Sequence, residues 1–430
     1  MAVAASGGLD STALLHCTVR AAALLGIRVH ALHVVHGLQP DAMAWRLQLE
    51  ARVRRWARSG WPVDFHWRAL DGQPGRGQSV EAWARAGRYA ALAAMARELG
   101  CGLVLLAHHR RDQAETVLLQ ALRGAGAAGG AAMPRRVARQ GVEWARPWLD
   151  QPRQALERYV QRHRLGFVQD PGNVDRRFDR NRIRHDVWPA LEAAFAHAEA
   201  ALAASARRSA EAEACLRELH EIDASACVRD GRLSLSAWMA LSGARRAHLL
   251  RRFLSDSAPV PVPDSLVLRL VEELPGRSAG RWPLGTGWVC LYRGELSLAT
   301  APTQPGTPAR GPLLDLSAAG WHAVPVWGGG FRVAHAACGG LPAGILARVE
   351  CRVRGGGERF SRGPGQAPRT LKKEFQHAGV PAWQRAGPLL YVEDRLLWVP
   401  GLGVDGAWHG RLDAEGLSLQ WEPREAPVPG

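Results

Sequence analysis

The sequence predicts an α/β protein that begins with a doubly wound parallel sheet and continues into a small helical domain and a carboxyl-terminal α+β domain. Apolar runs of strand length alternate with helical patterns up to about residue 190, as in a parallel sheet covered on both faces. A glycine-rich turn joins the first apolar run to the first helical pattern, and residues 301–312, rich in Pro, Gly and Thr, are expected to be a linker. We therefore expect domains at residues 1–190, 191–300 and 313–430.

The elements of the first domain follow from the period of the apolar residues. Strands are expected at residues 3–5, 29–35, 63–67 and 103–107. Helices are expected at residues 13–24, 41–58, 79–98 and 112–122, the third of them capped by Ser79. The carboxyl ends of such strands meet at one edge of the sheet, where ligands bind.

The remainder of the chain reads as mixed structure. The chain is expected to be Ala-rich and helical from residue 189 to about 219, with further helical segments over 235–254 and 265–274 and a strand at 288–292. Beyond the linker, short strand-like runs separated by Gly and Pro predict the α+β domain.

The chain is strongly basic. Its 430 residues carry 55 Lys and Arg against 40 Asp and Glu, a net charge of +15. An excess of this size favours a polyanionic partner, although a general preference for Arg would produce it as well. Lys372 and Lys373 are the only lysines, so this pair is a candidate for a contact that needs a compact ammonium group.

Cysteine usage and hydropathy restrict the class of protein. The seven Cys are scattered without a C-x-x-C pair, which argues against a zinc ribbon, an iron–sulfur site or a disulfide scaffold and suits a reducing cytoplasm. No apolar run approaches transmembrane length, so no membrane association is expected. A phosphate loop at residue 6 leaves no room for a signal peptide before it.

The turn Ser6-Gly7-Gly8-Leu9-Asp10-Ser11 is the clearest candidate site. Gly7 and Gly8 allow backbone N–H groups to converge on phosphate oxygens at a helix amino terminus, and the serines add hydroxyl donors. Asp10 beside a phosphate implies a bridging Mg²⁺. No Lys follows the glycines, so the loop differs from the Walker type and fits pyrophosphate as a leaving group. The alternative is an ordinary turn before a helix.

Two further groups of polar residues follow expected strands. His36 and His109 lie just beyond strand ends, where each could contact a nucleotide or be a surface histidine beside a turn. Asp112 and Glu115 are three residues apart at the start of a helix and so face one way. They could orient a cation or an amine, or simply favour the helix dipole.

Arginines form the third group. Arg123 adjoins a glycine-rich turn suited to anion contact, and Arg180 and Arg184 belong to five Arg that follow the turn at residues 170–173. The cluster suits a nucleic-acid backbone, and the alternative is a solvated run of charge.

Several motifs occur along the chain. They are SGGLDS at residues 6–11, HVVHGL at 33–38, SVEA followed by AR and RY at 79–89, AHH leading to DQAET at 107–116, DPGN at 170–173 and RNRIR at 180–184. Together they resemble the tRNA(Ile)-lysidine synthetases, a family of the PP-loop ATP pyrophosphatase superfamily with a Rossmann-like nucleotide-binding fold. The resemblance extends over nearly the whole chain.

This resemblance implies an ATP-dependent ligase. In such an enzyme the wobble cytidine of the CAU anticodon of tRNA(Ile) is adenylated, and free L-lysine then replaces AMP at C2. The lysidine so formed changes codon and amino-acid specificity from Met to Ile. The implied cofactors are ATP and Mg²⁺, and a homodimer is left open.

The resemblance also implies roles for individual residues. Ser6 to Ser11, His36 and His109 would bind ATP, with Asp10 at the metal. The catalytic residues would be Asp10, Asp112 and Glu115. The expected tRNA contacts are Arg85, Arg123, Arg180, Asn181, Arg184, Lys372 and Lys373.

Arg111 departs from the family pattern, which has an acidic residue at that position. It reverses a charge close to the expected site, so Asp112 would have to serve in place of the missing carboxylate. Two alternatives remain open. One is a tRNA thiolase of the same superfamily, although only Cys17 and Cys101 lie in the first domain. The other is a tRNA-binding module without catalytic activity.

Overall fold

The computed structural model describes residues 1–35, 41–70, 72, 75, 79–300, 310–336, 339–381, 385, 387–412 and 416–423. The chain divides into two compact units, Met1–Glu218 and Leu219–Gly430.

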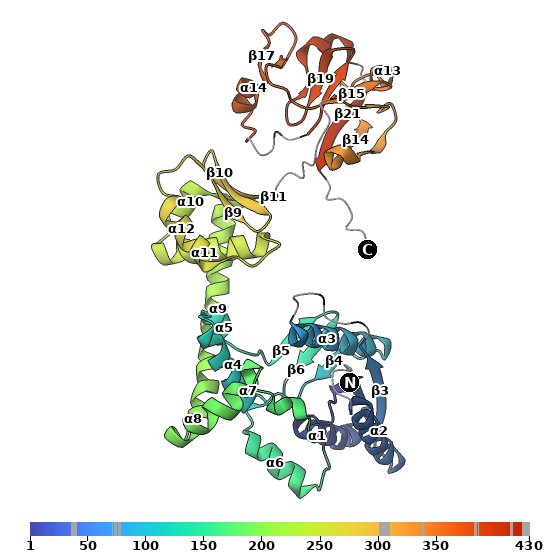
Figure 1. Cartoon of the computed structure of the whole chain (residues 1–430), viewed down its shortest axis with the longest axis vertical. Helices are drawn as coiled ribbons and strands as arrows, with labels where there is room; N and C mark the ends of the chain where they lie inside the picture. Colours follow the sequence, from blue (N-terminus) through green and yellow to red (C-terminus); the bar gives the residue numbers. More distant parts are fainter. Residues whose placement is uncertain are drawn as a thin grey trace. The chain divides into compact units, whose positions relative to one another are not determined.

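A six-stranded sheet forms the centre of the first unit, in the order β3-β2-β1-β4-β6-β5 (Figure 1). All neighbours pair in parallel except β5 and β6, which form an antiparallel hairpin at the edge. The predicted parallel sheet is therefore confirmed. Its strands are β1 (Ala2–Ala4), β2 (Val29–Val35), β3 (Val63–Ala69), β4 (Leu103–Leu105), β5 (Arg136–Arg139) and β6 (Val142–Ala145).

Both faces of this sheet are buried because its strands carry apolar residues on both sides. On β1, Val3 packs with α1 and α2, while its neighbour Ala2 packs on the other face with α3. Figure 1 shows α3 across the sheet from α1 and α2. The helices of this unit's first part are α1 (Leu9–Leu25), α2 (Ala42–Arg58), α3 (Val80–Glu98), α4 (Arg110–Leu122), α5 (Ala127–Gly130) and α6 (Arg153–Arg162).

A series of short helices follows the sheet. They are η1 (Pro171–Val174), α7 (Asp179–Arg182), the π-helical turn η2 (Ile183–Val187) and α8 (Trp188–Ala194). The helical segment expected from residue 189 to about 219 is helical, but it is interrupted once and ends later than expected. Phe195, at the C-cap of α8, leaves the helical conformation with φ −135° and ψ 96°, and α9 (Ala198–Cys227) then runs eight residues beyond the expected end.

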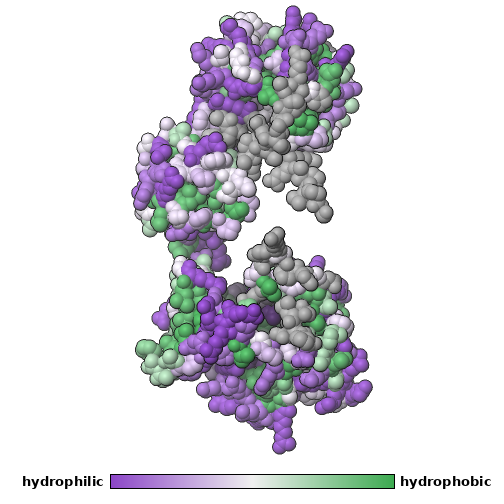
Figure 2. All heavy atoms as spheres, in the orientation of Figure 1, coloured by the Kyte–Doolittle hydropathy of each residue, from purple (hydrophilic) through white to green (hydrophobic). Residues whose placement is uncertain are grey.

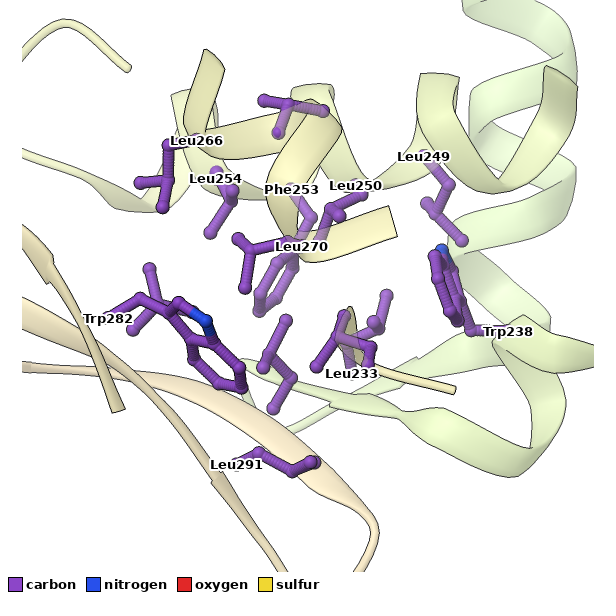
Figure 3. Close-up of a cluster of buried hydrophobic side chains, with 14 of the residues drawn as sticks. Leu233, Trp238, Leu249, Leu250, Phe253, Leu254, Leu266, Leu270, Trp282 and Leu291 are labelled. Carbon is purple, nitrogen blue, oxygen red and sulfur yellow. The ribbon is translucent and has the colours of Figure 1, made fainter. Parts of the chain in front are cut away.

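The second unit begins with the expected helices and adds a sheet to them. The helical segment expected at 235–254 is two helices, α10 (Leu235–Met239) and α11 (Gly243–Ser257), and α12 (Asp264–Glu273) follows. Figure 3 shows Trp282 and Leu291 of the sheet facing Leu254 and Leu270 of the helices. The antiparallel strands have the order β7 (Val228–Arg229), β8 (Arg232–Ser234), β11 (Glu295–Thr300), β10 (Gly287–Tyr292) and β9 (Ala279–Leu284).

The carboxyl-terminal part is α+β, as predicted. One sheet has the order β12 (Arg310–Leu314), β15 (Val349–Arg352), β18 (Leu389–Val392), β19 (Arg395–Val399) and β20 (Gly403–Val404). A second comprises β13 (Gly320–Val324), β14 (Gly329–His335) and β21 (Leu417–Pro423), and a small hairpin pairs β16 (Arg359–Phe360) with β17 (Arg369–Thr370). The helices are α13 (Ala343–Leu346) and α14 (Leu371–His377). Among the described helices, none has the length and apolar character needed to cross a membrane.

Candidate active site

The glycine-rich loop connects β1 to α1, at the carboxyl end of the central strand. Gly7 has φ +90°, a conformation that favours glycine, and Gly8 is the N-cap of α1. The N–H of Gly7 donates to Ser11 Oγ at 3.1 Å, and Ser6 Oγ lies 2.9 Å from the same oxygen. The Val168 N–H donates to the Gly7 carbonyl at 2.9 Å. The loop is thus braced by its own serines and by a distant segment, at a helix terminus that attracts anions.

Asp10 faces the start of α4. Its Oδ1 lies 3.7 Å from Nε2 of His109, the N-cap residue of α4, and Asp112 Oδ2 lies 3.5 Å from the same nitrogen. Burial alone would lower the pKa of His109, but Asp10 and Asp112 outweigh it and raise that pKa. Asp112 Oδ2 also accepts the His109 backbone N–H at 3.0 Å. The histidine therefore joins the loop to α4.

Two arginines bind the two carboxylates of α4. Arg180 contacts Asp112 Oδ1 at 2.8 Å and Glu115 Oε2 at 3.0 Å. Arg184 contacts Glu115 Oε2 at 2.8 Å through Nη2 and Glu115 Oε1 at 3.0 Å through Nε. The expected common orientation of Asp112 and Glu115 is therefore confirmed, since one guanidinium touches both. Glu115 is completely buried.

The neighbours of Asp112 and His108 determine which of these two side chains is charged. Burial would raise the pKa of Asp112, but His109 and Arg180 lower it to about 2. Burial next to Arg146 and Arg180 lowers the pKa of His108 to about 3, although Asp112 opposes the shift. At neutral pH the site therefore contains an ionised Asp112 and a neutral His108.

Three residues of this cluster were not predicted as site residues, namely Arg88, His108 and Arg146. Arg146 Nε donates to His108 Nδ1 at 3.3 Å and its Nη1 to the Pro134 carbonyl at 2.8 Å. Burial and nearby Arg85 and Arg180 lower the pKa of Arg88, against the effect of Tyr89. Arg88 and His108 lie within motifs of the family resemblance, which is the sequence signal that could have found them.

Comparisons with known proteins show the family to which the chain belongs. A PP-loop domain model matches residues 1–191, a TilS substrate binding domain model residues 233–297, and a TilS substrate C-terminal domain model residues 349–421. The tRNA(Ile)-lysidine synthase of Ralstonia nicotianae is 40% identical to this chain, over 95% of this chain and 91% of the relative. The chain belongs to the tRNA(Ile)-lysidine synthase family. The enzymes of that name from Burkholderia mallei and Pseudomonas aeruginosa are each 38% identical, over 98% of this chain and 93% of the relative.

Membership of the tRNA(Ile)-lysidine synthase family decides between the functions left open by the sequence. The family is one of ATP-using PP-loop ligases that act on tRNA, and it favours ligation over thiolation or binding alone. A solved U34-tRNA thiolase, NcsA from Methanococcus maripaludis with its [4Fe-4S] cluster, has a TM-score of 0.41 and 15% identity, covering 48% of this chain and 70% of that one. That likeness is too weak to bear on function.

The remaining predicted residues are not gathered into the cluster. His36 lies outside the described residues. Asn181 is buried and its Nδ2 donates to the carbonyls of Gly172 and Asp175, both at 2.9 Å, so it holds the preceding turn. Lys372 and Lys373 are exposed on α14, in the second unit.

Arg85 and Arg123 are surface residues. Arg85 is exposed, with its guanidinium 5.4 Å from the Tyr89 ring centroid. Arg123 pairs with Asp179 of α7 at 3.2 Å, and both side chains are about half exposed, at 61% and 47%. Figure 2 shows hydrophilic side chains gathered over α7, whose four residues are Asp, Arg, Asn and Arg. Arg180 and Arg184, in contrast, are turned toward carboxylates and are mostly buried, with side chains 26% and 23% exposed.

Arg111 does not place a cation beside Asp10. Its Nη2 contacts Glu192 Oε1 at 2.9 Å and its Nε contacts Glu199 Oε2 at 3.2 Å. The charge reversal seen in the sequence is therefore neutralised by α8 and α9, and Asp112 alone faces His109 from this part of α4.

Proposed function

We propose that this protein uses ATP and Mg²⁺ to adenylate the wobble cytidine of a CAU-anticodon tRNA(Ile), and then joins free L-lysine to C2 of that base. The observation that carries the proposal is the direct link between the phosphate loop and the carboxylate cluster, through Asp10, His109 and Asp112. The enzyme must first activate a base with ATP and then bring an amine to it, so the phosphate loop and the carboxylate cluster must both lie close to C2 of that base.

Asp10 supports the magnesium part of the proposal. Its Oδ1 is buried and has no hydrogen-bond partner. Within the described residues, no three His, Cys, Asp or Glu side chains are grouped to hold a metal ion. Mg²⁺ usually takes one or two carboxylates together with substrate phosphates, so the donor set fits a cation that arrives with ATP. When bound, Mg²⁺ would neutralise charge on the phosphate oxygens.

In the first step the C2 carbonyl oxygen of the cytidine attacks the α-phosphate, and pyrophosphate leaves. The loop residues Ser6 to Ser11 hold the leaving pyrophosphate through backbone N–H groups and hydroxyls. His109, whose pKa is raised despite its burial because of Asp10 and Asp112, lies beside the loop and can donate to a phosphate oxygen.

In the second step the ε-amine of lysine attacks C2, the C2–O bond breaks and AMP leaves. The amine must lose protons to become nucleophilic. With a pKa of about 2, Asp112 accepts a proton poorly at neutral pH, so it fits binding of the lysine ammonium better than its deprotonation. Glu115 is held by Arg180 and Arg184 and completes the anionic side of this pocket.

The decisive test is attachment of labelled L-lysine to a CAU-anticodon tRNA transcript in the presence of ATP. We expect labelled tRNA together with equimolar AMP and pyrophosphate. Failure of the wild-type chain to incorporate lysine, with an active family member as positive control, would contradict the proposal.

Asp10→Ala tests the role of the carboxylate at the loop. We expect loss of pyrophosphate release, because the cation and the phosphates lose a shared ligand. The control is Asp64→Ala, since Asp64 pairs with Arg28 at the other end of the sheet, at the start of β2 and β3. Lysine-dependent AMP formation by Asp10→Ala would show that the metal assignment is wrong.

Two further expectations complete the proposal. Because its substrates are tRNA and free lysine, we expect the protein to act in the cytoplasm. The sequence leaves a homodimer open, and light scattering of the full chain after gel filtration will give its oligomeric state.

A further inference from the structure

One face of the segment from α7 to α8 contacts the first turns of α4 through its side chains. Figure 1 shows α7 beside α4. Four side chains spaced four residues apart form this face: Arg180, Arg184, Trp188 and Glu192. The first two bind Asp112 and Glu115. The other two bind Arg111, whose guanidinium carbon lies 4.0 Å from the Trp188 ring centroid and whose Nη2 lies 2.9 Å from Glu192 Oε1. We call these four residues the register stripe.

A π-helical turn helps to keep the register stripe in line. Residues four apart on an α-helix drift about 40° around the axis, so a stripe of this length would turn away from α4. The turn Ile183–Val187 contains Arg184 and ends just before Trp188. A π-helical turn takes up more residues than an α-helical turn and so rotates the stripe back. Single π-helical turns of this kind occur frequently at functional sites.

Arg111 is the anchor of the stripe on α4. Besides Trp188 and Glu192 it contacts Glu199 of α9, which also binds Arg110 at 2.8 Å. The Arg111 side chain is 13% exposed and Trp188 is 1% exposed, so their stacking contact is shielded from water, whereas Glu192 is half exposed. A planar guanidinium stacks on an indole while its in-plane N–H groups bind carboxylates, and an ammonium has no planar face to stack in this way.

We propose that Arg111 is a positioning residue for lysine transfer, which rests on the function proposed above. Arg111 and Asp112 are consecutive on α4, and Arg184 and Trp188 are one turn apart on the stripe. By binding Trp188 and Glu192, Arg111 holds the register stripe in place along α4. The two arginines of the stripe are thereby held against the two carboxylates of α4. Without Arg111 the stripe can shift along α4, and the carboxylates lose the orientation that receives the lysine amine.

The test compares Arg111→Ala with Arg28→Ala in the full-length protein. Arg28 also forms an ion pair between two elements, with Asp64 at 2.9 Å, but at the other end of the sheet. For Arg111→Ala we expect kcat/KM for lysine to fall about tenfold or more, as displaced catalytic groups do. We expect tRNA-dependent ATP–pyrophosphate exchange without lysine to stay within about twofold, because His109 and the loop are untouched. Arg28→Ala should match the wild type in both assays.

Hydrogen exchange gives a readout independent of activity. Amides of residues 183–194 should exchange faster in Arg111→Ala than in the wild type, and those of α1 should not. Arg111→Lys keeps the charge without the planar stack, so its kcat/KM for lysine should lie between those of the wild type and Arg111→Ala. If Arg111→Ala does not fold, Glu192→Ala removes one half-exposed partner and should change lysine kinetics in the same direction.

Three results would overturn the inference: unchanged lysine kinetics in Arg111→Ala, equal losses in adenylation and lysine transfer, or unchanged exchange over residues 183–194. Each of these presupposes a wild-type protein that forms lysidine. A wild type that forms none contradicts the proposed function itself, so the two failures are distinguishable.

Discussion

At the scale of single residues, Asp112 shows how contacts decide what a carboxylate can do. One oxygen faces Arg180 at 2.8 Å, and the other accepts the His109 N–H at 3.0 Å and lies 3.5 Å from its ring. Although burial opposes ionisation, these neighbours lower its pKa from 3.8 to about 2. Asp112 is therefore suited to holding a cation at neutral pH and poorly suited to accepting a proton.

The depressed pKa of Asp112 predicts a pH-dependent contribution to stability. Because the pKa is lower in the folded chain, the contribution is fully present above pH 3.8 and is lost as the pH falls toward about 2. We expect Asp112→Asn to lower the free energy of unfolding by about 2 kcal/mol at pH 6. Urea denaturation between pH 6 and pH 2.5 should show this difference shrinking with acid, toward the value for the half-exposed control Asp64→Asn. A difference that stays constant with pH would contradict the electrostatic origin.

At the scale of elements, local signals predicted the parts and could not predict how they meet. The strand at 29–35 and the Ser79 cap of α3 are confirmed, because strand period and capping chemistry are local. Two expected bounds are each off by two residues: β4 ends at Leu105 instead of residue 107, and α4 begins at Arg110 instead of residue 112. The N-cap of α4 is His109, a residue type that is unusual at that position.

The pairing within the site could not be read from the sequence. Arg180 and Arg184 were expected to face nucleic acid, yet they bind Asp112 and Glu115, which are 65 to 72 residues away along the chain. A run of arginines looks the same whether it is solvated or paired. Only the packing of α7 and η2 on α4 decides between the two.

The packing of α4 also depends on Gln113, whose side-chain amide bonds both the N–H and the carbonyl of Met133. Its Nε2 donates to the Met133 carbonyl at 2.8 Å and its Oε1 accepts the Met133 N–H at 2.9 Å. The preceding residue, Ala132, has φ +53°, a strained conformation for a residue other than glycine. The amide therefore holds a turn that would not form by preference.

We expect Gln113→Leu to lower the free energy of unfolding by about 2 to 4 kcal/mol, because two buried backbone groups lose their partners. Urea denaturation measures this loss, and exchange of the Met133 amide should accelerate. Gln120→Leu, on the same helix but partly exposed, serves as the control. If the two variants are equally stable, the double contact with Met133 contributes nothing.

At the scale of the whole molecule, net charge and local contacts make different contributions to tRNA binding. The charge of +15 attracts any polyanion at long range, whereas a residue that touches a phosphate displaces a counterion there. Lys372 and Lys373 are exposed on α14, next to the hairpin of β16 and β17 that carries Arg359 and Arg369. This concentration of cations in the second unit is our candidate tRNA contact outside the catalytic unit.

The salt dependence of binding separates these two contributions. For Lys372→Ala with Lys373→Ala, we expect weaker tRNA binding and a slope of log K against log salt smaller by about 1 to 2, because up to two phosphate contacts are lost. The control pair Arg55→Ala with Arg58→Ala removes the same charge from an exposed part of α2 and should leave the slope nearly unchanged. Equal slopes in the two double variants would mean that the lysines act only through net charge.

The double variant Lys372→Arg with Lys373→Arg tests whether an ammonium group is needed. The charge is kept and only the shape of the cation differs. Retained tRNA affinity together with retained lysidine formation would therefore contradict a lysine-specific contact.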